Sequence, residues 1–129
     1  GAYVLLKEKA AKPDVILIGT GSETALCLAA AEKLEAEGIA SRVVSMPCQE
    51  LFELQTAEYK ESVLPADVRA RVAVELGVRQ GWDRYLGFEG KFLGMEGFGA
   101  SAPAGVLMEH FGFTPEHVAS LAKEVIQKK

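Results

Sequence analysis

The loop Gly19-Thr20-Gly21-Ser22 contains the residues whose types and spacing best suit a chemical role. It directly follows the apolar run Val15–Ile18 and directly precedes a helical pattern. Glycines permit a positive φ or a close approach of the backbone. Free N–H groups at a helix start, aided by the helix dipole, can bind an anion. An arginine beyond the fourth predicted strand could add a charged donor. The predicted anion-binding residues are Gly21, Ser22, Glu23 and Arg79.

A structural role for the same loop is an alternative. The two glycines would then make a tight strand-to-helix turn, and Ser22 would be the N-cap residue of the helix. The motif lacks the third glycine of a dinucleotide fingerprint and the lysine of a P-loop. Glu23 also opposes anion binding, because its carboxylate already complements the helix dipole. The sequence therefore leaves both roles open.

The other polar residues do not form a catalytic constellation. Cys48 lies near a predicted helix start, where a thiolate is favoured, but no histidine falls close to it in sequence. His110 and His117 lie at predicted helix ends, and this position accounts for each of them without a ligand role. Their spacing is also not that of a metal-binding pair on one helix. Glu75 on the fourth strand would need partners if it were buried, and Ser101 lacks the GxSxG elbow of a nucleophile. We therefore assign no catalytic residue and no metal site.

The apolar pattern predicts strands that alternate with helices. Residues 15–18 form a continuous apolar run, which is typical of a strand covered on both faces in a parallel sheet. The helix after it carries one apolar stripe and ends at Gly38 in a left-handed C-cap. The stripe consists of Cys27, Ala30, Ala31 and Leu34. The other predicted strands cover residues 2–7, 41–46, 70–76 and 91–95.

The later helical segments are less regular. Residues 49–63 are predicted to form helical turns in which Leu51, Phe52 and Leu54 dock on the sheet. The last helix begins at Thr114, an N-cap residue followed by a proline at the first helical position. The remaining predicted helical segments are residues 81–87, with room for about one turn, and residues 103–112.

The connection lengths predict strand directions. The linker of residues 8–13 is too short for a parallel crossover, so the first strand should run antiparallel to the second. A right-handed crossover should make the third strand parallel to the second. The alternation predicts an α/β fold with three layers, α/β/α. If the third and fourth strands flank the second, the loop at residues 19–22 lies at the switch point, where open α/β sheets bind ligands.

Size and composition limit the functional class. The 129 residues suffice for one domain with a real core, residues 1–129. A net charge of −4 and the lack of a long basic run argue against a nucleic-acid partner. No apolar segment approaches the ~20 residues of a membrane span, so we expect a soluble, cytoplasmic protein. The chain lacks an initiator Met and enters a strand-like run at once, which favours a domain excised from a longer polypeptide.

Seven motifs follow one another along the chain. They are GAYVL at residues 1–5, PDVILIGTGSE at 13–23, RVVSMPCQELFELQ at 42–55, ESVLP at 61–65, RVAVELG at 71–77, GWDRYLG at 81–87 and GFGASAPAGVLMEHFGFT at 97–114. In this order they resemble the C-terminal domain of transketolase. The resemblance covers nearly the whole chain. The chain departs from the family at Gly19 and Thr24, where Ala and Val are frequent, and at Val78-Arg79, where small or hydroxyl residues are common.

The resemblance implies a five-stranded mixed sheet whose first strand is antiparallel to the rest. It also implies a homodimeric parent enzyme of the pentose phosphate pathway, which transfers two-carbon ketol units between sugar phosphates. Such an enzyme uses thiamine diphosphate with Mg²⁺ or Ca²⁺, held between its two preceding domains. The metal-diphosphate motif, GDG followed by a paired Asn, is absent here, as is the histidine-rich substrate channel. No catalytic residue carries over, and this domain is expected to bind no cofactor.

The expected role is therefore that of a non-catalytic domain, whether structural, dimer-supporting or regulatory, whose partners are the remaining domains of the parent chain. One alternative is an independent small-anion or nucleotide-binding α/β module. A third interpretation is the equivalent domain of a dehydrogenase E1 β-subunit or of deoxyxylulose-phosphate synthase, which shares the fold. The segments SMPCQELF and GWDRYLG resemble the transketolase forms more closely.

Overall fold

A five-stranded mixed sheet organises the chain in a computed structural model that describes residues 1–75, 81–94 and 113–127. The strand order is β1-β3-β2-β4-β5. The strands are β1 (Tyr3–Leu6), β2 (Val15–Gly19), β3 (Ser41–Ser45), β4 (Arg71–Val74) and β5 (Lys91–Leu93). The helices are η1 (Gly21–Glu23), α1 (Thr24–Ala36), α2 (Gln49–Glu53), α3 (Ala57–Val63), α4 (Asp83–Leu86) and α6 (Pro115–Gln127).

The predicted strand directions are confirmed. β2 pairs in parallel with β3 and β4, and β4 pairs in parallel with β5. β1 runs antiparallel, but it pairs with β3 at the sheet edge and does not lie beside β2. The short linker sets only the direction of β1, because a linker length does not select the neighbour. The predicted segment 103–112 and the outer parts of the fourth and fifth predicted strands lie outside the described residues.

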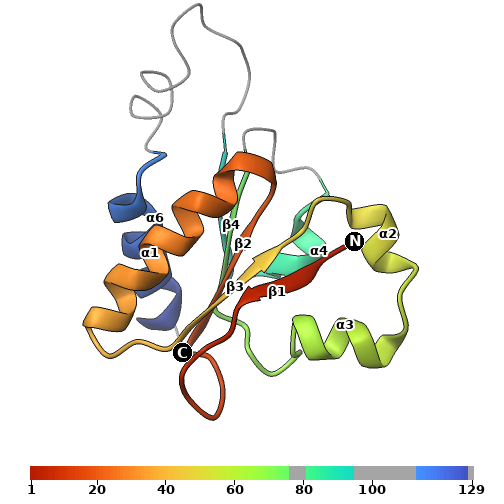
Figure 1. The fold of residues 1–129 in the computed structure, drawn as a ribbon, viewed down its shortest axis with the longest axis horizontal. Helices are drawn as coiled ribbons and strands as arrows, with labels where there is room; N and C mark the ends of the chain where they lie inside the picture. The colour runs from red at the N-terminus through yellow and green to blue at the C-terminus, as the bar shows by residue number, and fades with distance from the viewer. Residues whose placement is uncertain (76–80, 95–112, 128–129) are drawn as a thin grey trace, which may run out of the picture.

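Two helical layers cover the two faces of the sheet, as predicted (Figure 1). Val15 and Leu17 of β2 point into a core formed with α1 and α6, whereas Ile16 and Ile18 point into a core formed with α2, α3 and α4. Every residue of β2 is buried. The run is apolar throughout for the predicted reason: successive side chains point to opposite faces of the sheet, and a helical layer covers each face.

Helix α1 confirms the predicted stripe and the predicted C-terminal signal. Cys27, Ala30, Ala31 and Leu34 are its buried residues. Gly38 has a φ of 80°, and its N–H donates to Glu35 O at 2.9 Å. The N–H of Ile39 donates to Leu34 O at 3.0 Å, which completes a Schellman motif.

Thr114 is the N-cap residue of α6, as predicted. Its hydroxyl accepts a hydrogen bond from the N–H of His117 at 3.1 Å.

The prediction for residues 49–63 was partly wrong. Phe52 is buried, but Leu51 and Leu54 are 53% and 81% exposed. The segment is two helices with a break at residues 54–56. A helix of five residues turns little more than once, so only one of its two apolar side chains, Phe52, points at the sheet, and Leu54 follows the helix as its C-cap residue.

A buried ion pair, missed by the sequence analysis, ties the first linker to the sheet. Arg42 of β3 binds Glu8 through two hydrogen bonds of 2.8 Å, from Nε and Nη2. Its Nη1 donates to Ser62 O at 2.9 Å and Val63 O at 3.1 Å, at the C-terminal end of α3. The hydrogen bond from Arg42 lowers the pKa of Glu8. One guanidinium thus holds three segments that are distant in sequence.

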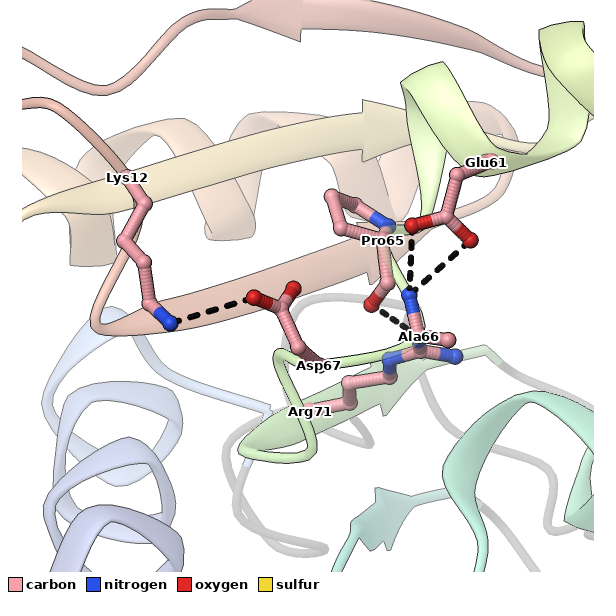
Figure 2. A network of polar contacts seen from close by, with 6 residues as sticks. All are labelled: Lys12, Glu61, Pro65, Ala66, Asp67 and Arg71. Carbon is pink, nitrogen blue, oxygen red and sulfur yellow. Dashed lines mark hydrogen bonds and ion pairs between the residues drawn. The ribbon is translucent and has the colours of Figure 1, made fainter.

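A second guanidinium organises the turn that leads into β4. Figure 2 shows Arg71 beside the carbonyl of Pro65, to which its Nη2 donates at 2.8 Å. Its Nε donates to Val68 O at 2.9 Å and its Nη1 to Tyr85 O at 2.7 Å. Burial lowers the pKa of Arg71. Carbonyls near the ends of α3 and α4 carry partial negative charge, which offsets the cost of burying this cation.

The same turn is closed by two carboxylates. Both carboxylate oxygens of Glu61 accept from the N–H of Ala66 at 3.1 Å. Asp67 forms an ion pair of 3.2 Å with Lys12, which lies in the linker before β2, so the pair connects this turn to that linker (Figure 2). The Lys12–Asp67 pair is exposed and contributes little, typically under about 1 kcal/mol. The hydrogen bonds of Arg71 are partly buried, so water competes with them less than with the exposed Lys12–Asp67 pair.

Within the part of the chain that the structure describes, no helix has both the length and the apolar character needed to cross a bilayer.

The buried ion pair generates a stability prediction. Replacing Glu8→Gln should lower the free energy of unfolding by about 3 kcal/mol, because it leaves the Arg42 charge buried without its counter-charge. Urea denaturation followed by circular dichroism measures the change. Glu35→Gln is the matched control, since Glu35 meets Lys9 at 3.9 Å on the exposed surface, and it should cost under about 1 kcal/mol.

The pH dependence of the same variant follows from the lowered pKa of Glu8. Ionised Glu8 contributes its full stability above the unfolded-state pKa of about 4.3 and loses it as pH falls through the lower folded-state pKa. The difference in free energy of unfolding between the unmodified chain and Glu8→Gln should therefore be constant from about pH 7 to 5. It should become smaller below about pH 4.3. Equal stability of the two chains at neutral pH would contradict a folded-state role for the pair.

Candidate functional site

The carboxyl edge of β2 is the switch point of the sheet. β3 and β4 lie on opposite sides of β2, as the prediction for residues 19–22 required. The chain leaves β2 at Gly19, and the turn η1 leads it into α1. Gly19 is packed closely there: a Cβ added to it would lie 3.0 Å from the Cα of Thr24 and 3.1 Å from the Sγ of Cys27. The strand and the helix are thus closely packed at this glycine, and a side chain there would require its neighbours to shift by a few tenths of an ångström.

The turn itself differs from the predicted helix cap. Gly21 has a φ of 52°, a conformation that favours glycine, and nothing crowds it. The hydroxyl of Thr24 donates to Gly21 O at 2.8 Å. Ser22 is not the N-cap of the helix, so that prediction was wrong. It lies inside η1, and its hydroxyl donates to the Glu23 carboxylate.

The structure brings three of the four predicted anion-binding residues together in this turn. Gly21 and Ser22 are exposed, whereas Glu23 is buried. The N–H of Glu23 already donates to Thr20 O at 3.0 Å, so this predicted donor is engaged within the turn. Arg79, the predicted charged donor, lies outside the described residues. Among the described residues of this turn, Gly21 and Ser22 are the exposed predicted donors and the Glu23 carboxylate lies beside them, so anion binding here stays a prediction.

A cleft of about 380 Å³ opens at the same edge. Its described lining comes from Thr20 after β2, from residues 46–48 after β3, from the first residues of α2, and from Glu75 and Trp82. Glu75 lies just after the end of β4 and is half-buried, and Trp82 Nε1 donates to its carboxylate. Glu50 adds a second carboxylate, and the described lining contains no basic side chain. The cleft therefore favours hydrogen-bond donors or cations over anions.

A second cleft, of about 470 Å³, lies at the opposite end of β4. Arg69, Arg71 and Arg84 line it together with Phe88 and Glu89. The donors of Arg71 are directed at main-chain carbonyls, Arg69 lies 3.8 Å from Glu89, and Arg84 lies 3.8 Å from Glu53. These cations serve the structure of the loops. The cleft is remote from the switch point.

Tyr85 and Glu53 form a pair that no local sequence signal indicated. The Tyr85 hydroxyl donates to the Glu53 carboxylate at 2.8 Å. Burial and the neighbouring Glu53 raise the pKa of Tyr85, and the hydrogen bond from Tyr85 lowers the pKa of Glu53. Tyr85 also packs edge-on against Phe52 and Trp82, with ring centroids 5.9 Å apart in each pair. The pair joins α2 to α4, which is a packing role.

The two cysteines have different surroundings, as predicted. Cys27 is fully buried beneath the turn, and burial raises the pKa of its thiol to about 12. Cys48 is the N-cap residue of α2 and half-buried in the cleft. Of the two histidines, His117 lies in the first turn of α6, and His110 lies outside the described residues, as does Ser101. Within the described ranges, no three His, Cys, Asp or Glu side chains are grouped to hold a metal ion.

Comparison with known proteins identifies the domain. Residues 1–114 match the model of the transketolase-like C-terminal domain. The chain belongs to the transketolase C-terminal domain family. It is 53% identical over 126 residues to transketolase 1 of Escherichia coli, a match that spans 98% of this chain and 19% of that protein. It thus spans about a fifth of the length of the curated relatives it matches.

Solved transketolases have the same fold. Transketolase from Leishmania mexicana superposes with a TM-score of 0.90 at 43% identity, over 99% of this chain and 18% of that one. Transketolase from Pichia stipitis, in complex with sedoheptulose-7-phosphate, superposes with a TM-score of 0.88 at 39% identity, again over 99% and 18%. These matches agree with the transketolase C-terminal domain resemblance and with its five-stranded mixed sheet.

The burial of the thiols predicts their reactivity. At pH 8 only on the order of 10⁻⁴ of Cys27 is thiolate, given its pKa of about 12, so Cys48 should react first with iodoacetamide. Mass-resolved labelling of the native chain measures both rates. In denaturant the two rates should converge, which serves as the control. Equal rates in the native chain would show that the face of α1 assigned to the core is exposed.

The turn at Gly21 generates a binding prediction. Inorganic phosphate should bind weakly, with a Kd in the millimolar range or about −4 kcal/mol, because few neutral donors face an acidic neighbourhood. A phosphate titration followed by amide NMR should move the resonances of residues 19–24 most. Ser22→Pro, which removes one amide, should weaken that response. Larger shifts elsewhere, or an unchanged response in Ser22→Pro, would leave the loop as a turn only.

Proposed function

We propose that this chain is the C-terminal domain of a full-length transketolase. The parent protein would transfer two-carbon ketol units between sugar phosphates in the pentose phosphate pathway, in the cytoplasm, as a homodimer. The observation that supports this most is similarity along 98% of the chain to 19% of a transketolase, at 53% identity. The sugar phosphate bound to the Pichia stipitis relative supports the substrate class.

Within that enzyme we assign this domain a non-catalytic role. The residues present do not fit thiamine diphosphate and its metal ion. The sequence contains neither a GDG segment nor any asparagine, and the described residues offer no cluster of metal ligands. The cleft at the switch point presents the carboxylates of Glu50 and Glu75, which would repel a diphosphate. The cofactor would therefore be held by the remaining domains, and this one would support packing, dimer formation or regulation.

The two alternative functions have less support. An independent anion or nucleotide module would need more donors than the turn at Gly21 and Ser22 provides. The matched family model and relatives are transketolases, which favours that enzyme over a dehydrogenase E1 β-subunit or deoxyxylulose-phosphate synthase. The coding sequence upstream of Gly1 separates the transketolase domain from an independent module. A transketolase requires a cofactor-binding region there, and a free-standing module does not.

The activity test compares the full-length protein with the present chain. Purified full-length protein with thiamine diphosphate and Mg²⁺ should transfer a ketol unit from a ketose phosphate to an aldose phosphate, measured by a coupled assay. The 129-residue chain should show no turnover, and titration calorimetry should show no saturable heat with thiamine diphosphate and Mg²⁺. A micromolar Kd for the cofactor on the short chain, or an inactive full-length protein, would contradict the proposal.

A further inference from the structure

The cleft of about 470 Å³ at the start of β4 carries an excess of positive charge. Its described lining contains the guanidinium groups of Arg69, Arg71 and Arg84 but a single carboxylate, that of Glu89. The chain as a whole has a net charge of −4, so this excess of cations is a local feature. The volume falls within the range of about 300–1,000 Å³ that small-molecule sites occupy. The cleft is therefore suited to an anion in both charge and size.

Arg71 is the half-buried cation of this cleft, and its charge is fixed in place. Its hydrogen bonds go to main-chain carbonyls, among them those of Pro65 and Tyr85. No carboxylate within the described residues accepts a hydrogen bond from it, and Glu61 acts on it only by electrostatic attraction. Partial burial reduces the screening of its charge by water. Arg71 therefore gives the cleft a lasting positive potential.

Arg69 and Arg84 are the exposed cations of the cleft, and their present partners hold them loosely. Nη1 of Arg69 lies 3.8 Å from the Glu89 carboxylate, and Nη1 of Arg84 lies 3.8 Å from that of Glu53. Both distances exceed the length of a hydrogen bond, and exposed ion pairs of this kind are weak. A ligand carboxylate can take the place of either glutamate, because one guanidinium offers two parallel N–H groups to a planar carboxylate.

Phe88 adds an apolar ring at the edge of the same cleft. Its side chain is fully exposed. The residue before it, Gly87, has a φ of 63°, a conformation that favours glycine. At the other end of the turn the N–H of Gly90 donates to Leu86 O at 3.0 Å, and a Cβ added to Gly90 would lie 2.5 Å from that oxygen. The two glycines therefore fix a tight main-chain turn that holds the ring outward.

We propose that this cleft is a binding site for a small aromatic carboxylate. Its carboxylate binds Arg69 and Arg84 beside the fixed charge of Arg71, where glutamate carboxylates already show the chemistry that these cations accept. Its ring packs on Phe88, a contact that aromatic groups favour and that a glutamate side chain cannot offer. The ring therefore lets the ligand displace the glutamates, whereas a simple anion has no such advantage over them.

Arginine modification with phenylglyoxal tests the site in the full-length protein, with benzoate as the probe. Mass spectrometry measures the modification of Arg69 and Arg84 separately from that of every other arginine. Benzoate at about ten times its Kd leaves about a tenth of the sites free by mass action, so modification of both residues should slow about tenfold. Acetate, which has the charge without the ring, and phenol, which has the ring without the charge at pH 7, should protect neither residue at the same concentration.

Three results of this experiment would overturn the proposal. Unprotected arginines at saturating benzoate would show that no site exists. Equal protection by acetate would show that the ring contributes nothing. Arginines that fail to react even without benzoate would show that another part of the full-length protein covers the cleft.

Variants separate the ring contact from the cations, with calorimetry of the 129-residue chain as the measurement. Phe88→Ser should raise the Kd for benzoate about tenfold, and Arg69→Gln with Arg84→Gln should abolish saturable heat. Lys33→Gln with Lys123→Gln is the matched control and should leave the Kd unchanged. It removes two exposed cations that pair with glutamates in the α1 and α6 layer, on the other face of the sheet.

The same variants show whether a loss of binding reflects folding. All four substituted cations are exposed, so the urea midpoint of each double variant should match that of the unmodified chain. An equal loss of benzoate binding in both double variants would reduce the effect to net charge and overturn the site. A Kd that Phe88→Ser leaves unchanged would equally overturn it, because the ligand would then need no ring contact.

Discussion

The burial of β2 on both faces is the constraint on which the rest of the structure depends. Four consecutive aliphatic residues, Val15–Ile18, have no accessible surface. Each full burial of such a side chain contributes about 1.5–3 kcal/mol, but only if a helical layer covers it. The strand therefore requires α1 and α6 on one side and α2, α3 and α4 on the other. The three layers, and the position of the switch point, follow from that requirement.

Two arginines bind main-chain carbonyl groups beneath the α2, α3 and α4 layer, which apolar side chains cannot do. Arg42 is the second residue of β3 and Arg71 is the first residue of β4, the two parallel strands that flank β2. Both direct their guanidinium groups at main-chain carbonyls near the end of α3. Helix ends leave carbonyls without intrahelical partners, and a planar cation with five donors can satisfy several of them. Arg42 has a hydrogen-bonded carboxylate partner in Glu8, whereas Arg71 donates to main-chain carbonyls and has only the electrostatic attraction of Glu61. These polar contacts of the α2, α3 and α4 layer thus have a structural role.

The chemistry of the carboxyl edge shows how much a local motif can mislead. The loop at residues 19–22 has the glycines, the hydroxyl and the position of an anion site. In the folded chain, however, Gly19 packs closely between β2 and α1, and the Ser22 hydroxyl is hydrogen-bonded to the Glu23 carboxylate. The cleft that does form there is lined by Glu50 and Glu75. Fold position at a switch point makes a ligand site possible, but the side chains around it decide its charge.

The sequence by itself determined the features that depend on local order along the chain. These are the double-sided burial of β2, the stripe of α1, the left-handed Gly38, the Thr114 cap, the direction of β1 and, through ordered motifs, the family. Only the tertiary structure decided which residues meet across long separations: Glu8 with Arg42, Tyr85 with Glu53, Trp82 with Glu75, and β1 with β3. The same holds for the outward direction of Leu51 and Leu54. Periodicity reports a preference for burial, whereas the partner of a buried polar group, and the break that turns a short helix outward, depend on how distant segments pack.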